Sequence, residues 1–562
     1  MNSRKSAATV RPPARSRRGV AVRVLVALGA LALLATALLL LPGVRAPVSR
    51  ALDGLPGGSG LKAQVKGLLQ QGRLAWEQAA GQTPIPYAEP AELVPVAHTG
   101  VYPYGVNVFF EQEVEEWKLR RSMEVLREMG IRWVRQQVPW ERIEPERKGD
   151  FTSVYGSTWA QFDRVLPLAQ EYGLEVLARL DLPPPWARSN PAIPASAPAR
   201  IEDYGDFVEA FVRRYRGRVR YLQVWNEPNL VGEWGGPPDA ARYVALLREA
   251  YTRIKAVDPA IVVLSASLAP TLGTPDGLNQ SDLTYLQAMY DVGAAPYFDI
   301  LGAQGYGLWT GPDDRRVSPD HVNMSRAQLL RGIMVRNGDA RKAIWITEYG
   351  WNALPPEFPG EATHGRVTEE EQARYTVEGL RRIQQEWPWV GAVFTWHFRR
   401  VSDEDRDQVM FYYRLMDPDF TPRPVFHALR DLIRREPVVE RGWFQEDHWA
   451  LRYQGEWRQA ESPDALLGGY RQPQPGAALE FTFRGTDLSL VLLAGPEGGR
   501  FQVAVDGAVP ERLVLEARAP EPRSAIVAVV RGLPDGLHRV RLEAEGAPGA
   551  WGLDGFLVER TP

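Results

Sequence analysis

The sequence predicts an α/β protein built on a (β/α)8 barrel, with a C-terminal all-β jelly-roll sandwich and an N-terminal transmembrane or signal helix. Short runs rich in Val and Ile alternate with amphipathic stretches eight times in the middle of the chain, and this helical periodicity ends near residue 440. A charge-free apolar run lies near the N-terminus. We therefore divide the chain into four parts: 1–46, 47–97, 98–437 and 440–562.

The N-terminal part joins a basic flank to an apolar segment. The first 52 residues contain nine Lys or Arg and no acidic residue, and residues 24–41 carry no charge. This length is at the lower limit for crossing a bilayer, and a basic flank stays cytoplasmic. We expect a membrane anchor that places the rest of the chain outside the cytoplasm, or a secreted form cleaved near residues 44–46. Residues 47–97 include a Gly/Pro-rich piece and are expected to form a linker.

The barrel prediction depends on eight apolar runs that alternate with helical patterns. Gly130, Gly173 and Gly217 follow the first three of these patterns, where a left-handed residue commonly ends a helix. Eight units are what a closed barrel requires. An open doubly wound sheet is the alternative, but no Gly-rich phosphate-binding loop follows the first run. The expected strands are 105–110, 131–138, 174–181, 218–225, 260–266, 298–303, 342–348 and 390–396.

After about residue 440 the sequence changes to short stretches with alternating apolar residues. Turn sequences such as Pro534-Asp535-Gly536 separate them. Closely spaced strands with such turns are typical of a sandwich, here most simply a jelly roll. The expected strands are 479–483, 488–493, 501–505, 512–515, 525–530, 538–542 and 553–558.

Composition excludes several classes of function. The chain has no Cys, which excludes disulfides, thiolate nucleophiles and Cys-ligated metals. Beyond the first 52 residues, 57 basic groups face 69 acidic ones, and this balance argues against a nucleic-acid partner. We expect no metal ion and no cofactor. The 18 Trp residues serve either core packing or stacking on sugars.

Two glutamates follow predicted strands and are the candidate catalytic residues. Glu227 lies in Trp-Asn-Glu-Pro-Asn at the end of the fourth strand, and Glu348 lies in Thr-Glu-Tyr-Gly at the end of the seventh. Because the carboxyl ends of barrel strands meet at one rim, we expect the two side chains to face each other. Glycoside cleavage needs one carboxyl to protonate the leaving oxygen and another to attack or to activate water. For either glutamate alone, a surface ion pair is the alternative.

With these motifs the chain resembles clan A glycoside hydrolases, which are retaining enzymes on a (β/α)8 barrel, over about residues 98–435. Xylosidase-like and cellulase-like members are the most similar. The resemblance implies that Glu227 is the acid/base and Glu348 the nucleophile. It also implies that Arg135 hydrogen-bonds the nucleophile and that Asn226 binds the sugar 2-hydroxyl. Tyr306 would donate its hydroxyl to Glu348.

Four further residues are candidates for substrate binding. Trp396 resembles the platform beneath the reacting sugar. Gln304 occupies a position where many relatives have His, and its neutral amide can still hydrogen-bond a sugar. Trp140 and Trp186 serve either packing or substrate contact. Asp181 is expected to have a local hydrogen-bonding role.

The C-terminal sandwich resembles galactose-binding-like accessory domains, mainly through residues 501–507. It is expected to support the barrel or to bind a sugar. Together these features predict a retaining glycosidase that hydrolyses O-glycosidic bonds of a β-linked oligo- or polysaccharide. A glycan-remodelling transglycosidase and a non-catalytic polysaccharide-binding barrel are the alternatives. The expected partners are the saccharide and, through the N-terminal helix, the membrane.

Overall fold

The computed structural model describes residues 94–547 and 549–560. The predicted N-terminal helix at residues 24–41 and nearly all of the linker lie outside this range. Within the described residues, no helix is both long enough and apolar enough to cross a membrane.

Eight parallel strands form one sheet, in the order β7-β6-β5-β2-β1-β10-β9-β8. Two isolated parallel bridges, Leu264–Ile300 and Leu268–Ala303, join the two ends of this order and close the sheet. The predicted barrel is therefore confirmed. Its strands are β1 (Tyr104–Val108), β2 (Trp133–Pro139), β5 (Glu175–Asp181), β6 (Tyr221–Val224), β7 (Val262–Leu264), β8 (Leu301–Tyr306), β9 (Ile344–Gly350) and β10 (Val390–Thr395).

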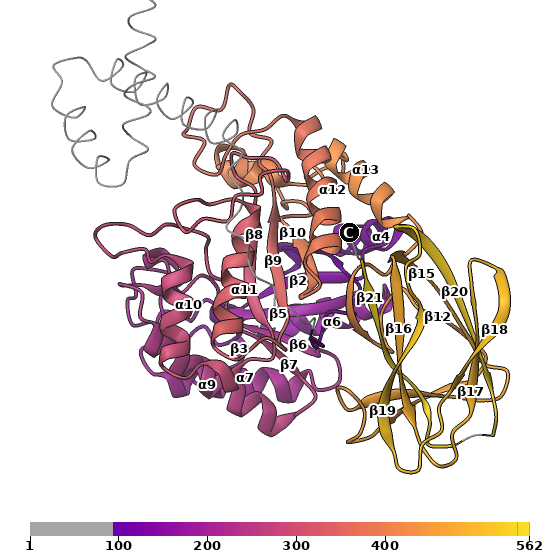
Figure 1. Cartoon of the computed structure of the whole chain (residues 1–562). Helices are drawn as coiled ribbons and strands as arrows, with labels where there is room; N and C mark the ends of the chain where they lie inside the picture. Colours follow the sequence, from indigo (N-terminus) through magenta and orange to yellow (C-terminus); the bar gives the residue numbers. More distant parts are fainter. Residues whose placement is uncertain (1–93, 548, 561–562) are drawn as a thin grey trace, which may run out of the picture. The chain divides into compact units, whose positions relative to one another are not determined.

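One longer helix follows each barrel strand, and Figure 1 shows these helices outside the sheet. Gly130, Gly173 and Gly217 have φ values of 94°, 72° and 73°, as predicted for residues that end helices. The eight helices are α4 (Glu116–Met129), α6 (Ala160–Glu171), α7 (Ile201–Arg214), α9 (Ala240–Val257), α10 (Asp282–Asp291), α11 (Ala327–Arg336), α12 (Glu369–Glu386) and α13 (Pro424–Ile433).

Shorter elements occupy the connections. They are α5 (Trp140–Ile143), α8 (Val231–Trp234), the hairpin β3 (Thr152–Ser153) and β4 (Gly156–Ser157), and the 3-10 segments η1 (Phe110–Gln112), η2 (Ala295–Tyr297), η3 (Met324–Arg326), η4 (Glu404–Asp407) and η5 (Val409–Tyr413). Most of them follow strands and therefore lie on the face of the barrel where the strands end.

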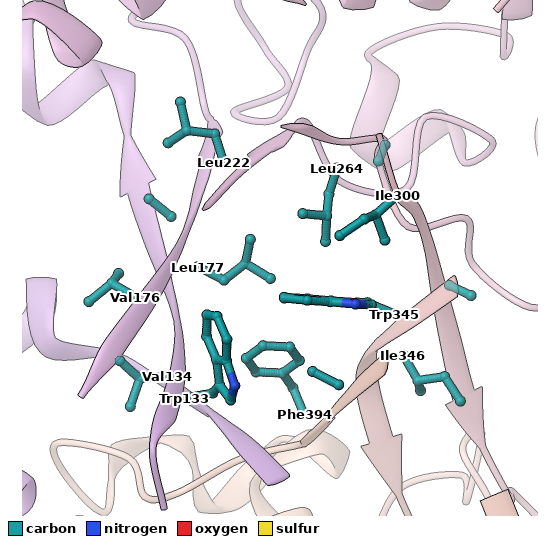
Figure 2. Close-up of a cluster of buried hydrophobic side chains, with 14 of the residues drawn as sticks. Trp133, Val134, Val176, Leu177, Leu222, Leu264, Ile300, Trp345, Ile346 and Phe394 are labelled. Atoms are coloured by element: carbon teal, nitrogen blue, oxygen red, sulfur yellow. The ribbon is translucent and has the colours of Figure 1, made fainter. Parts of the chain in front are cut away.

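A layer of aromatic side chains fills the barrel near the beginnings of its strands. Figure 2 shows Trp133, Trp345 and Phe394 pointing toward one another between the strands. Their neighbours in sequence point to the other side of the sheet, as the alternation of a strand requires. Tyr221 stacks on Trp345 with ring centroids 5.2 Å apart. Trp345 and Phe394 have no exposed surface, so this layer closes the barrel from below.

Gly105 on β1 makes room for this layer. A Cβ atom at residue 105 would lie 2.5 Å from the Phe394 ring. We expect Gly105→Ala to lower the free energy of unfolding by about 1–3 kcal/mol, because overpacking outweighs the smaller gain in backbone entropy. Gly232→Ala is the matched control, since a Cβ there meets nothing within 4 Å. Thermal and urea unfolding of both variants measure the difference, and equal stabilities would contradict the steric argument.

The C-terminal part is a sandwich of two antiparallel sheets whose facing side chains share one core, including Phe481, Leu490, Leu542 and Phe556. One sheet contains β11 (Gly442–Gln445), β13 (Trp457–Glu461), β14 (Gly469–Pro473), β16 (Asp487–Ala494), β19 (Arg523–Val530) and β21 (Gly552–Glu559). The other contains β12 (Arg452–Gln454), β15 (Ala478–Gly485), β17 (Arg500–Val505), β18 (Ala508–Glu516) and β20 (Gly536–Glu545). All seven predicted strands are present, and β11 to β14 are additional.

Candidate active site

Glu348 owes its direction to an irregularity in β9. Ala303 on β8 pairs with Ile346, but the next residue, Gln304, pairs with Glu348, so Thr347 is an extra residue in β9. A bulge of this kind changes the direction of the following side chain. Thr347 Oγ1 contacts Ser267 Oγ at 2.5 Å, and the adjacent Glu348 carboxylate also reaches buried partners. The consecutive side chains of Thr347 and Glu348 thus both make contacts inside the barrel.

Arg135 on β2 is the buried cation that holds Glu348. Its Nη1 donates to Glu348 Oε1 at 2.8 Å, and the guanidinium is only 2% exposed. Three further donors of the guanidinium are used by the side-chain oxygens of Asn107 at 2.9 Å, Gln223 at 2.8 Å and Asn226 at 3.0 Å. These contacts fix the guanidinium in one orientation. Since these three acceptors are neutral, the direct ion pair of Arg135 is with Glu348.

Tyr306, the last residue of β8, holds the other oxygen of the same carboxylate. Its hydroxyl donates to Glu348 Oε2 at 2.8 Å. Burial and then the Glu348 charge raise the pKa of Tyr306 well above its ordinary value, so the hydroxyl keeps its proton and remains a donor. Arg179 Nη1 adds a second cation 3.8 Å from Glu348 Oε1. Glu348 is therefore held as an oriented carboxylate with a donor on each oxygen.

Glu227 projects from a tight turn at the end of β6. Trp225 and Glu227 both have positive φ values, 74° and 40°, which side chains other than glycine rarely adopt. The turn is held by the Glu227 N–H, which donates to Ser267 O at 3.0 Å, and by the Trp225 indole, which donates to Glu233 O at 3.0 Å. Backbone strain of this kind costs about 1–3 kcal/mol per residue and is concentrated at functional sites.

The carboxyl group of Glu227 differs electrostatically from that of Glu348. Burial raises its pKa, and the charges of Glu348 and Glu233 raise it further, to about 8. Gln304 Nε2 donates to Glu227 Oε1. A neutral carboxyl group accepts on one oxygen and carries its proton on the other. The raised pKa therefore favours the protonated form of Glu227 at neutral pH.

The Asn226 side chain lies between Arg135 and Glu233. Because its Oδ1 accepts from Arg135, its amide nitrogen faces the opposite direction, where Glu233 Oε2 lies 3.5 Å away. In this orientation the amide nitrogen of Asn226 is a donor directed away from Arg135. The arrangement agrees with the role that the resemblance implies for Asn226, which stays a prediction.

The site contains three charged residues that were not predicted to contact substrate or to act in catalysis, namely Glu233, Asp181 and Arg179. Glu233 on α8 is half-buried, and burial raises its pKa while the Arg179 charge lowers it. Asp181 accepts from Gln137 at 2.8 Å and lies 2.7 Å from Arg179 Nε, so its role is local, as expected. Among the described residues, no three His, Asp or Glu side chains are grouped in a way that would hold a metal ion.

The three candidate tryptophans have different positions. Trp396 is half-buried at the end of β10, edge-on to Phe109 at 5.7 Å, and its indole N–H has no hydrogen-bond partner in the described part of the chain. Trp140 is fully buried, stacks on Phe207 at 5.2 Å and donates to Glu144 at 2.6 Å. The full burial of its ring favours packing, one of the two alternatives for Trp140, and its contact with substrate stays untested. Trp186 is partly exposed and packs edge-on to Trp140, so its substrate contact stays a prediction.

The family comparison concerns the C-terminal part of the chain, whereas the similar solved structures cover about four fifths of the chain. Residues 466–561 match the family model described as carbohydrate esterase 2 N-terminal, which lies in the sandwich. No curated protein matches the chain.

Similar solved structures include a family 39 glycoside hydrolase from Bacteroides cellulosilyticus WH2, with 16% identity, 80% of this chain and 83% of that chain covered, and a TM-score of 0.46. A GH39 β-xylosidase from Caulobacter crescentus has 17% identity, covers 81% and 98%, and has a TM-score of 0.44. The GH39 enzyme from Xanthomonas axonopodis pv. citri has 14% identity, covers 81% and 95%, and has a TM-score of 0.44.

Proposed function

We propose that the chain is a retaining glycosidase that hydrolyses O-glycosidic bonds of a β-linked oligo- or polysaccharide. One observation carries the proposal: two glutamates at the ends of β6 and β9 have opposite electrostatic settings. Glu348 is an anion held by Arg135 and Tyr306, whereas burial and neighbouring carboxylates raise the pKa of Glu227 to about 8. A nucleophile and a proton donor are the two groups that double displacement requires.

In the first step, a Glu348 oxygen attacks the anomeric carbon while Glu227 gives its proton to the glycosidic oxygen. The bond between the anomeric carbon and that oxygen breaks, and a glycosyl ester forms on Glu348. The hydrogen bonds from Arg135 and Tyr306 orient the carboxylate before the attack, which removes an entropic cost.

In the second step, Glu227 acts as a base. Once Glu348 is esterified its charge is gone, and with it one of the causes that raise the pKa of Glu227. The ionised Glu227 then takes a proton from water, whose oxygen attacks the anomeric carbon and releases Glu348. The coupling between the two carboxylates thus sets the protonation state of Glu227 for each step.

We also propose that the enzyme acts outside the cytoplasm, anchored by residues 24–41 or secreted after cleavage. The basic flank and the charge-free run support this location. Polymeric glycans of the cell envelope and its surroundings are the substrates that such a location offers.

The proposal is tested by following the anomeric configuration of the first product by proton NMR. The assay uses a panel of aryl β-glycosides, which need little help from the acid. We expect the β-anomer to appear first and then to mutarotate. Initial appearance of the α-anomer would indicate single displacement and exclude Glu348 as a nucleophile. Absence of turnover across the panel would contradict glycosidase activity on β-linked sugars.

A further inference from the structure

The exposed hydrophobic residues of the barrel are concentrated on the face that carries the two glutamates. Eight large hydrophobic side chains of the described barrel are exposed, and only Val292 follows a helix. The other seven lie in the segments that follow strands, and these segments all reach the face where parallel strands end. They are Val114 and Trp117 after β1, Val154 and Tyr155 after β2, Leu272 and Leu278 after β7, and Trp309 after β8.

Trp309 is the member of this group closest in sequence to the catalytic machinery. It follows Tyr306, which binds Glu348, by three residues, so their Cα atoms lie within about 11 Å. Its indole is 61% exposed. Trp309 therefore lies close to Tyr306 along the chain and offers most of its ring surface to solvent.

The segment around Trp309 is held rigidly. A Cβ atom at Gly307 would collide with the Trp351 ring, and one at Gly365 would collide with the carbonyl oxygen of Leu308. The Trp351 indole donates to Thr310 O at 2.7 Å. Leu308 has a φ of 53°, a left-handed conformation that is unfavourable for a branched side chain. The backbone next to Trp309 is therefore confined by its neighbours, while the large apolar ring itself remains exposed.

We propose that Trp309 is the stacking platform of a distal subsite, and that the substrate is a glycan chain extending past the reacting bond over this side of the barrel. The inference rests on the proposed glycosidase function and names its substrate class. The apolar C–H face of a pyranose fits an exposed indole, and such contacts with aromatic rings contribute binding energy beyond area burial. Rigidity of the platform reduces the entropy lost on binding.

The test measures kcat/KM of the full-length protein on an aryl β-monoglycoside and on β-1,4-linked xylo-, manno- and gluco-oligosaccharides of increasing length. We expect Trp309→Ala to lower kcat/KM on the cleaved oligosaccharides about three- to tenfold more than on the monoglycoside. The deficit should grow with chain length until the subsite is filled. Trp309→Phe, which keeps a flat ring, should recover most of the loss.

Trp117→Ala is the matched control, because its indole is 59% exposed but packs on Phe420. An equal length-dependent loss in this variant would overturn the assignment to Trp309. The assignment would also be overturned if Trp309→Ala lost the same factor in kcat/KM on every substrate, or lost none on any of them. A wild-type protein that cleaves the monoglycoside but none of the oligosaccharides would overturn it as well. Inactivity of the wild type on every substrate would instead contradict the proposed function itself.

Discussion

Replacing Glu348 by alanine is expected to lower kcat/KM on aryl β-glycosides by a factor on the order of 10⁴ or more, as is typical when a covalent nucleophile is removed. The reason is geometric as well as chemical. The bulge at Thr347 and the two donors to Glu348 orient one carboxylate for the proposed attack, and no other described carboxylate is bound by both Arg135 and Tyr306. Steady-state kinetics of purified protein measure the loss.

Azide provides the chemical control for this variant. A small anion can enter the space left by the Glu348 side chain and attack the anomeric carbon, giving an α-glycosyl azide from a β-glycoside. We expect partial recovery of turnover with azide and this product by NMR. Because Arg135 loses its ion-pair partner, the folded fraction must be checked by circular dichroism. A folded Glu348→Ala variant with wild-type turnover would remove Glu348 from the mechanism.

The second large effect concerns the proton on Glu227. Glu227→Gln keeps the shape of the protonated side chain but cannot donate, so kcat/KM on substrates with poor leaving groups should fall about 10²- to 10⁴-fold. In the wild type, kcat/KM should decline as the pH rises through about 8, because the acid form is lost. This decline should be absent in Glu227→Gln. A wild-type-like basic limb in the variant would assign the ionisation to another group.

The same substitution should stabilise the protein. The pKa of Glu227 lies above the ordinary value of 4.5, so the folded state binds more protons than the unfolded state between about pH 4.5 and pH 8. The stability due to this group is complete below about pH 4.5 and is lost as the pH rises through about 8. Glu227→Gln stays neutral, so its melting temperature should exceed that of the wild type at pH 8 and approach it near pH 4. We therefore expect Glu227 to make the folded protein less stable at pH 8 than a neutral glutamine at the same position would.

The barrel was predictable because its strands are buried on both faces. Each of the eight predicted runs overlaps an observed strand, since a buried parallel strand needs nearly continuous apolar residues and leaves a strong signal. Strands β12 and β13 left no such signal. Trp457–Glu461, for example, is mostly exposed and polar, and its position depends on pairing with β14. Hydrogen bonding to a neighbour does not depend on side-chain type, and so the sequence pattern could not reveal it.

The residues of the candidate site could be predicted where a recognisable motif lies on a predicted strand or just after it. Glu227, Glu348, Arg135, Asn226, Tyr306 and Gln304 are joined by hydrogen bonds, ion pairs or direct electrostatic coupling. Arg179 was not predicted as a site residue, although a charged residue at an inward position of a buried strand could have indicated it. Glu233 left no signal in the sequence, because a carboxylate on a short helix such as α8 is usually solvated. The Trp225 indole bonds the turn at the end of β6 to the Glu233 carbonyl on α8.

The aromatic layer of Trp133, Tyr221, Trp345 and Phe394 has a consequence for the order of events during turnover. Because this layer closes the barrel beneath the glutamates, we expect substrate, products and water all to enter and leave by the face where the strands end. In the proposed mechanism, we expect water to reach the glycosyl ester along the path by which the first leaving sugar went out. A second sugar waiting on that path, for instance one retained by Trp309, would meet the ester before water does. We therefore expect the balance between hydrolysis and chain transfer to depend on acceptor concentration.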